Sequence, residues 1–332
     1  MRDVVLLADP KSSSWGFAKK IQEYIYKNKE EKVQLAKLEM TRFNNKEIMP
    51  HVPENIRKKD VYFVQSSKKH PNDWWVELLL TKDLCASASA NSISFILPNM
   101  NYTRQDRKHK SRVPISSRAF ANSISSGLKR IITMDLHSAQ IQNAYPANVP
   151  IDNLYSFPEV VKHIRSKHLS DLENLVVISP DAGGVDRAAS FLGRLINATH
   201  EFDQKPHNYS FAFTHKLRSK PGEIEKMWLI GDVKDKNVLV IDDIYDTGGT
   251  NIKCAELLRE AGAQKLMSYA THGLFTKGTE GLLKTYDSIL TSNTHYKPKK
   301  GNGNIEVIDM SGSFAEAIYR AQKGQSISKM FD

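Results

Sequence analysis

A run of carboxylates, glycines and threonines that follows an apolar segment is the part of this sequence best suited to chemistry. Residues 238–241, Val-Leu-Val-Ile, predict a buried strand, and Asp242 and Asp243 come directly after it. A short loop then leads into a helical pattern that stops at Gly262. Acidic residues at the carboxyl end of a parallel strand lie where α/β sheets bind ligands.

The loop itself has the composition of a phosphate site. It consists of Asp246, Thr247, Gly248, Gly249 and Thr250. A glycine-rich turn at a helix N-terminus presents backbone N–H groups to an anion, and the two threonine hydroxyls add donors. The carboxylates before the loop can accept hydrogen bonds from vicinal hydroxyls or hold Mg²⁺. The sequence therefore predicts a sugar-phosphate site; an ordinary strand–turn–helix with acidic capping is the alternative.

This stretch resembles the phosphoribosyl-pyrophosphate motif shared by type I phosphoribosyltransferases and ribose-phosphate diphosphokinases. The resemblance implies that Asp242 and Asp243 contact the ribose hydroxyls and that residues 246–250 hold the 5-phosphate. The motif fits both families, so the choice between them depends on the rest of the chain.

Length and composition limit the classes of function. The 332 residues are enough for about two domains, and no apolar run approaches the roughly 20 residues of a membrane span. Cys85 and Cys254 stand in apolar patterns, so nothing calls for an oxidising compartment, and we expect a cytoplasmic protein. The net charge of +10 is spread over several clusters without a recognised nucleic-acid motif. Anionic small substrates explain this charge better than nucleic acid does.

A second polar segment lies in the first half of the chain. Residues 102–116 are rich in side chains that could meet phosphate, and Arg104 and Gln105 suit the phosphates and base of a nucleotide. Further on, a strand-like run from Ile131 ends in Asp135 and His137. Residues two apart on an extended strand share a face, so these two could flank a metal–phosphate group. A solvated loop and a structural hydrogen-bonded pair are the alternatives.

These two segments together are similar to the nucleotide-binding half of ribose-phosphate diphosphokinase, which a phosphoribosyltransferase is not expected to carry. The resemblance extends from about Phe43 to Ile327 and implies ATP as a substrate. The residues that it assigns to ATP are Phe43, Asn45, Glu47, Arg104, Gln105 and Asp106. The first three match a loop that reaches a neighbouring subunit's ATP in the family, so a homo-oligomer of dimers assembling to a hexamer is implied.

The second half of the chain adds the charged groups that the family uses for catalysis. By resemblance, Lys216 and Arg218 are the cations of the catalytic loop, and His137 joins them. Asp181 stands in a Pro-Asp-Ala-Gly-Gly run after Leu175–Ser179, an apolar run that predicts a strand, and it matches the ribose-phosphate and metal end of the family's site. The implied cofactor is Mg²⁺, with Asp135, His137 and Asp181 as its expected ligands.

Alternating strand and helix patterns predict an α/β fold with mostly parallel sheets. The resemblance implies two similar phosphoribosyltransferase-type, Rossmann-like domains: an ATP-binding domain over 1–153, onto which a helix in 311–332 packs back, and a ribose-5-phosphate-binding domain over 154–310. The pattern over Val33–Glu39 indicates a single strand, and residues 200–208 read as an extra hairpin or loop. The resulting hypothesis is diphosphoryl transfer from ATP to ribose 5-phosphate, without a membrane or nucleic-acid partner. A catalytically silent relative and a phosphoribosyltransferase are the alternatives.

Overall fold

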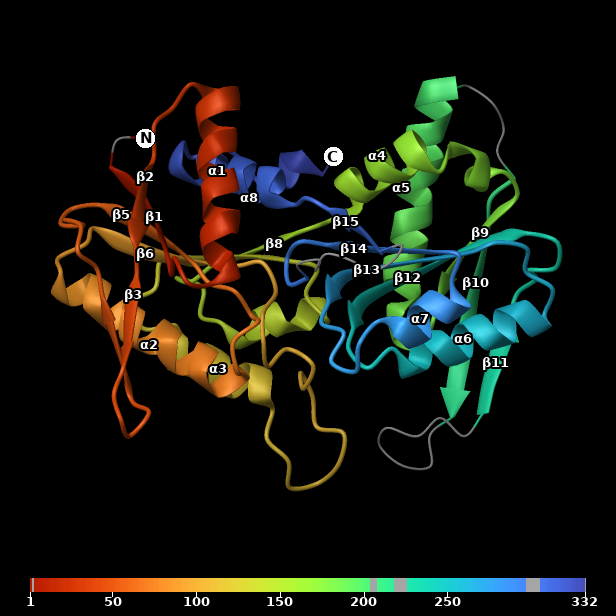
Figure 1. Ribbon diagram of the computed structural model, residues 1–332, viewed down its shortest axis with the longest axis horizontal. Helices are drawn as coiled ribbons and strands as arrows, with labels where there is room; N and C mark the ends of the chain where they lie inside the picture. Colours follow the sequence, from red (N-terminus) through yellow and green to blue (C-terminus); the bar gives the residue numbers. More distant parts are fainter. Residues whose placement is uncertain (2, 204–207, 218–225, 297–304, 332) are drawn as a thin grey trace. The chain divides into compact units, whose positions relative to one another are not determined.

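The computed structural model describes residues 1, 3–203, 208–217, 226–296 and 305–331. The chain divides into two compact units (Figure 1). The first unit comprises Met1–Tyr155 with Met310–Asp332, and the second comprises Ser156–Asp309. Among the described residues, no helix has the length and apolar character needed to cross a membrane.

The main sheet of the first unit has six parallel strands in the order β2-β1-β5-β6-β7-β8. Its strands are β1 (Val4–Ala8), β2 (Gln34–Lys37), β5 (Asp60–Val64), β6 (Ser92–Leu97), β7 (Arg130–Met134) and β8 (Ile151–Leu154). A separate antiparallel hairpin is formed by β3 (Glu39–Arg42) and β4 (Ile48–His51). The helices are α1 (Ser13–Lys29), α2 (Pro71–Ser87), α3 (Ser116–Ile124) and α8 (Ser311–Gln322), with the 3₁₀ turns η1 (Ala139–Ala144) and η4 (Ser328–Met330).

Helices cover both faces of this sheet, which explains why its inner strands β1, β5 and β6 are almost entirely buried (Figure 1). All five residues of β1 are buried. Leu7 belongs to a core cluster with Trp74 of α2 and Phe120 of α3, while α1 and α8 pack together on the other side. On that side Gln322 of α8 donates a 2.8 Å hydrogen bond to Asp60, which fixes the C-terminal helix against β5.

The second unit has a seven-stranded sheet in the order β11-β10-β9-β12-β13-β14-β15, in which only the β10–β11 pair is antiparallel. Its strands are β9 (Leu175–Ser179), β10 (Ser210–Leu217), β11 (Lys226–Ile230), β12 (Asn237–Tyr245), β13 (Leu266–Gly273), β14 (Ser288–Ser292) and β15 (Ile305–Ile308). Its helices are α4 (Phe157–Lys167), α5 (Val185–Asp203), α6 (Gly249–Glu260) and α7 (Glu280–Thr285), with the 3₁₀ turns η2 (Leu169–Leu172) and η3 (Ala182–Gly184). The predicted α/β class with mostly parallel sheets is confirmed.

The two sheets repeat one strand order. If β11 is set aside, the order β10-β9-β12-β13-β14-β15 matches β2-β1-β5-β6-β7-β8 strand for strand in chain sequence. In each sheet the direction of winding reverses once, between β1 and β5 and between β9 and β12. Ligands of open α/β sheets bind beyond the carboxyl ends of the strands at such a switch point.

Two local predictions were wrong. Residues 200–203 continue helix α5 instead of forming a hairpin or loop, because the apolar spacing of α5 carries the helix past His200; residues 204–207 lie outside the described part of the chain. The single strand expected over Val33–Glu39 is split into β2 and β3, and β3 leaves the sheet to pair with β4.

Candidate functional site

The two adjacent carboxylates of β12 point to opposite faces of the sheet, as strand alternation requires. Asp243 lies on the α5 side, where its Oδ1 is 3.3 Å from Nη1 of Arg187. Asp242 lies on the α6 side, where its Oδ2 accepts a 3.0 Å hydrogen bond from Nδ2 of Asn251. Each carboxylate is therefore anchored by a different helix. Asp243 is 4% exposed, whereas Asp242 is only partly buried.

This pair of acids has a perturbed protonation equilibrium. Burial, followed by the negative charge of Asp243, raises the pKa of Asp242 to about 7, although Arg187 and Asn251 act in the opposite direction. Two close carboxylates resist being ionised together unless a cation joins them. The end of β12 therefore favours a bound cation or hydroxyl donors over an empty, fully ionised state. The Oδ1 of Asn251 is buried and has no hydrogen-bond partner among the described residues.

The loop after β12 begins helix α6 without a side-chain cap. Gly248 is the N-cap residue and has a φ of 76°, a left-handed conformation that suits glycine. A Cβ on Gly248 would lie 3.1 Å from Cγ of the buried Leu282. Thr247 and Gly249 are exposed and Thr250 is partly exposed. Asp246 is tied to Thr276, whose hydroxyl donates a 2.6 Å hydrogen bond to its carboxylate. The N–H of Gly249 donates a long hydrogen bond of 3.4 Å to Oγ1 of Thr247, and the N–H groups of Thr250 and Asn251 that follow are left for an acceptor from outside.

The neighbouring strand β9 ends in the second acidic position. Asp181 caps the turn η3, and its Oδ1 accepts a 3.1 Å hydrogen bond from the N–H of Gly184. Its other oxygen, Oδ2, forms an ion pair with Nζ of Lys216 in β10. Burial raises the pKa of Asp181, but the charge and hydrogen bond of Lys216 and the Gly184 N–H outweigh it, so that the pKa lies below its ordinary value. Arg218 lies outside the described residues.

The second unit thus brings together much of the predicted sugar-phosphate site. Since β9 and β12 are hydrogen-bonded neighbours on either side of the switch point, Asp181 and the Asp242–Asp243 pair leave the same edge of one sheet. Lys216 reaches this edge from β10, the next strand.

In the first unit, the interpretation of Asp135 and His137 as neighbours on one strand face was wrong. Strand β7 ends at Met134, and Asp135 has a φ of 41°, which turns the chain out of the extended conformation. As a result Asp135 is buried and His137 is exposed. Both residues follow the carboxyl end of β7, beside the end of β6.

The residues expected to meet ATP lie in two places within the first unit. Arg104, Gln105 and Asp106 are in the loop between β6 and α3, and Gln105 is fixed there because its Oε1 accepts a 2.7 Å hydrogen bond from the Ser116 hydroxyl. A second group occupies the exposed turn between β3 and β4, and it consists of Phe43, Asn45 and Glu47. Phe43, although apolar, is 47% exposed at this tip.

At the switch point of the first unit, a salt-bridge network occupies the place that acids and a glycine loop hold in the second. Nζ of Lys69 lies 2.8 Å from both Asp9 and Glu77, and Gln65 also donates a hydrogen bond to Glu77. Asp9 and Gln65 directly follow β1 and β5. The two units therefore share a strand order but differ in chemistry at the same position.

Arg187 and Asn251 are site residues that the sequence interpretation missed. Arg187 follows the Gly183–Gly184 pair by three positions and is the first cation of α5. Asn251 is a buried polar residue in the first turn of α6. A polar residue on the apolar face of a helix that starts at a ligand loop is the signal that was available for Asn251.

Comparison with known proteins identifies two family models along the chain. Residues 10–127 match the N-terminal domain of ribose phosphate pyrophosphokinase, and residues 171–332 match a phosphoribosyl synthetase-associated domain. Among solved structures, phosphoribosylpyrophosphate synthetase from Mycobacterium smegmatis is 29% identical, with a TM-score of 0.84 over 97% of this chain and 100% of that one. A purine phosphoribosyltransferase from Pyrococcus horikoshii matches 46% of this chain and 87% of its own at 16% identity, with a TM-score of 0.30.

The first family model lies within the first unit, and the second covers most of the second unit together with residues 310–332 of the first. Together the two models span most of the sequence. The synthetase structure matches across both units, including the first unit, which the phosphoribosyl-pyrophosphate motif alone does not require. The chain therefore belongs to the ribose-phosphate diphosphokinase (phosphoribosyl-pyrophosphate synthetase) family of transferases, which serves nucleotide biosynthesis.

Proposed function

We propose that this protein transfers the β,γ-diphosphoryl group of ATP to the 1-hydroxyl of ribose 5-phosphate, which gives phosphoribosyl pyrophosphate and AMP. The observation that carries the proposal is the convergence of Asp181, Lys216 and the Asp242–Asp243 pair at one sheet edge of a chain that belongs to this family. A catalytically silent relative would have no need to retain an acid–base pair of this kind next to the acidic strand end.

Ribose 5-phosphate would bind in the second unit. Its phosphate would accept hydrogen bonds from the N-terminus of α6 and from the hydroxyls of Thr247 and Thr250, where the helix lacks a side-chain cap. Its ring hydroxyls would donate to Asp242 and Asp243. Since the pKa of Asp242 is raised, hydroxyl donors at that carboxylate would favour its ionised form.

ATP would be bound by residues of the first unit, and cations would support transfer of its diphosphoryl group. Arg104, Gln105 and Asp106 would contact the nucleotide, with Phe43, Asn45 and Glu47 of the hairpin turn serving the adenine of a neighbouring subunit. Phosphoryl-type transfer depends mainly on positioning and on neutralising charge. Three cationic or polar groups would therefore stabilise the group in transit: His137, Lys216 and Arg218.

The acidic side chains fit a hard cation such as Mg²⁺. Mg²⁺ prefers oxygen ligands, and the carboxylates of Asp135 and Asp181 offer them, whereas the imidazole of His137 suits it less well. Burial and the nearby charge of Asp243 raise the pKa of Asp242, which also indicates a place where positive charge is favoured. When bound, Mg²⁺ would neutralise the phosphate oxygens and orient the substrates. Lys216 would keep Asp181 in place until then.

The test is to mix the protein with ATP, Mg²⁺ and ribose 5-phosphate and to measure AMP. AMP together with phosphoribosyl pyrophosphate is the expected result. If no AMP forms but a nucleobase reacts with phosphoribosyl pyrophosphate, the protein is a phosphoribosyltransferase. If neither reaction occurs and the protein instead alters the rate of an active synthetase, it is a silent partner.

A homo-oligomer is part of the same proposal, as is a cytoplasmic location. The exposed ring of Phe43 supports oligomer formation, because covering it with a second copy would remove apolar surface from water. Size-exclusion chromatography with light scattering would measure the subunit number. A monomer that turns over at full rate would show that the hairpin does not serve a neighbour.

A further inference from the structure

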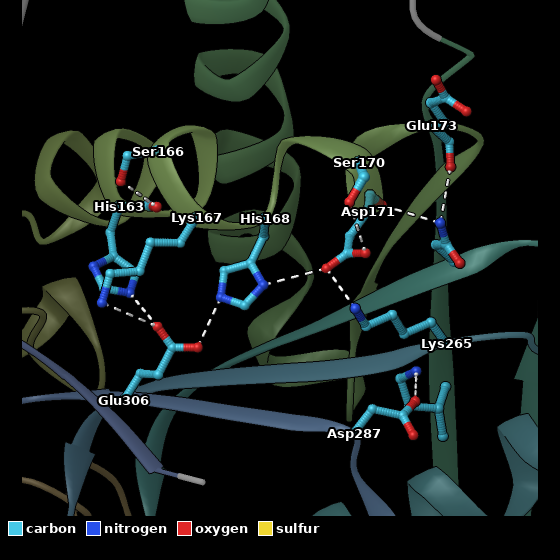
Figure 2. A network of polar contacts seen from close by, with 12 residues as sticks. His163, Ser166, Lys167, His168, Ser170, Asp171, Glu173, Lys265, Asp287 and Glu306 are labelled. Atoms are coloured by element: carbon cyan, nitrogen blue, oxygen red, sulfur yellow. Dashed lines mark hydrogen bonds and ion pairs between the residues drawn. The ribbon is translucent and has the colours of Figure 1, made fainter.

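Two histidines and a glutamate lie close together in the second unit, and the proposed reaction gives none of the three a role. Figure 2 shows His163 in the last turns of α4, His168 directly after that helix and Glu306 in the edge strand β15. Nε2 of His163 lies 2.7 Å from Oε2 of Glu306, and Nε2 of His168 lies 2.8 Å from Oε1 of the same carboxylate. One ligand atom from each of the three residues lies within 4.8 Å of the other two.

A further carboxylate orients the ring of His168. Nδ1 of His168 lies 3.2 Å from Oδ2 of Asp171, and that oxygen is also bound by Nζ of Lys265 at 2.7 Å (Figure 2). A carboxylate on the far nitrogen of a histidine is the usual outer partner of a metal-ligating imidazole, because it fixes the proton on that nitrogen. In this structure the other nitrogen, Nε2, is at hydrogen-bond distance from Glu306, so a metal ion bound here would take the place of the proton between Nε2 and that carboxylate.

We propose that His163, His168 and Glu306 form a binding site for a divalent transition metal of the zinc class. Two imidazoles and one carboxylate are a known zinc ligand set, completed by water at the fourth position. With metal–ligand bonds of about 2.0–2.1 Å, tetrahedral ligand atoms lie roughly 3.3 Å apart. The two nitrogen–oxygen distances of 2.7 and 2.8 Å therefore need to open by only about half an ångström.

The two lysines near the site, Lys167 and Lys265, leave room for a doubly charged metal ion. Lys167 lies 3.6 Å from Glu306, but its side chain is 58% exposed and can turn into water. Lys265 is engaged by Asp171. The metal would join the end of α4 to β15, an edge strand that, among the described residues, has a hydrogen-bonded neighbour on one side only. Its expected effect is to stabilise the second unit, since a ligand bound only by the folded state raises the melting temperature.

The experiment uses the full-length protein, stripped with a chelator, dialysed and kept in excess Mg²⁺ so that oxygen-only sites are filled. Zn²⁺ is titrated against a chromogenic chelator, and the melting temperature is measured in parallel. We expect one tightly bound Zn²⁺ per chain and a higher melting temperature. Both His163→Ala and Glu306→Gln should weaken zinc binding at least about tenfold. His200→Ala, which removes an exposed histidine of α5 in the same unit, should bind like the wild type.

Circular dichroism reports whether each variant folds. Should His163→Ala fail to fold, Glu306→Gln decides the question, because it keeps the size of the side chain and removes only its charge. Wild-type protein that binds no Zn²⁺, or a Glu306→Gln variant that binds Zn²⁺ as tightly as the wild type, would overturn the proposal. Tetrahedral Co²⁺ absorption in the wild type that is lost in Glu306→Gln would support it.

Discussion

Replacing Gly248 by Ala tests how the loop of residues 246–250, the proposed phosphate-binding loop, is built. Gly248 has a φ of 76°, where a Cβ costs about 1–2 kcal/mol. The added Cβ would also lie 3.1 and 3.2 Å from two atoms of Leu282, which is 2% exposed, and forced overpacking costs about 1–3 kcal/mol. The free energy of unfolding should therefore fall by about 2–5 kcal/mol. The KM for ribose 5-phosphate should rise, because the loop must shift.

Gly262 provides the matched control at the other end of the same helix. Its φ is 86°, but the closest atom to an added Cβ is Cγ of Lys234 at 3.4 Å, an ordinary contact with a flexible side chain. Gly262→Ala should therefore lose only about 1–2 kcal/mol and leave the KM unchanged. Both variants are compared by thermal and denaturant unfolding and by the AMP assay.

A third variant separates the two contributions to the Gly248→Ala loss. Leu282→Ala alone leaves a cavity, but combined with Gly248→Ala it removes the steric conflict. The loss of unfolding free energy in the double variant should therefore be smaller than the sum of the two single losses by about 1 kcal/mol or more. Equal losses for Gly248→Ala and Gly262→Ala, with additive behaviour in the double variant, would refute the steric argument.

Three further predictions concern charged groups. Lys216→Ala should reduce turnover by about 10²–10³-fold without changing the circular dichroism spectrum, and unchanged turnover would remove Lys216 from the mechanism. Arg187→Ala leaves the carboxylate of Asp243 buried without its cation, so denaturant unfolding should show a loss of about 3–5 kcal/mol; a loss below about 1 kcal/mol would contradict this. Burial raises the pKa of Asp60, but hydrogen bonds, including that from Gln322, hold it below its ordinary value. The ionised Asp60 therefore stabilises the folded state at pH values above the pKa that it has in the unfolded chain. This stabilisation is lost as the pH falls through the pKa of Asp60 in the folded state. Wild-type stability should then fall more steeply between about pH 5 and pH 3 than that of Asp60→Asn, and parallel pH profiles would argue against the interaction.

The strands were the most predictable part of the fold. A buried parallel strand needs a continuous apolar run, and this local signal placed β9 on the same residues, Leu175–Ser179, as the structure does. By contrast, the turn at Asp135 depends on a left-handed backbone conformation that no neighbouring residue predicts. The expectation for Asp135 and His137 failed for this reason.

Side-chain partners were predictable only where a motif places them. The Asp242–Asp243 pair and the glycine loop stand together in the sequence, but their anchors, Arg187 and Asn251, lie on two different helices. Similarly, His163 and Glu306 are 143 positions apart, and only the pairing of β15 with β14 brings that glutamate to α4. Contacts of this kind depend on the tertiary fold and have no local pattern.

The salt-bridge network at the switch point of the first unit has a consequence for where phosphorylated ligands can dock. Asp9 and Glu77 share the single ammonium group of Lys69, so this spot carries an excess of negative charge. A phosphate group would be repelled there, or it would have to displace the lysine and leave two carboxylates buried without a cation. We therefore expect the first unit not to bind a sugar phosphate in the corresponding place, although it has the same strand order as the unit that carries the glycine loop.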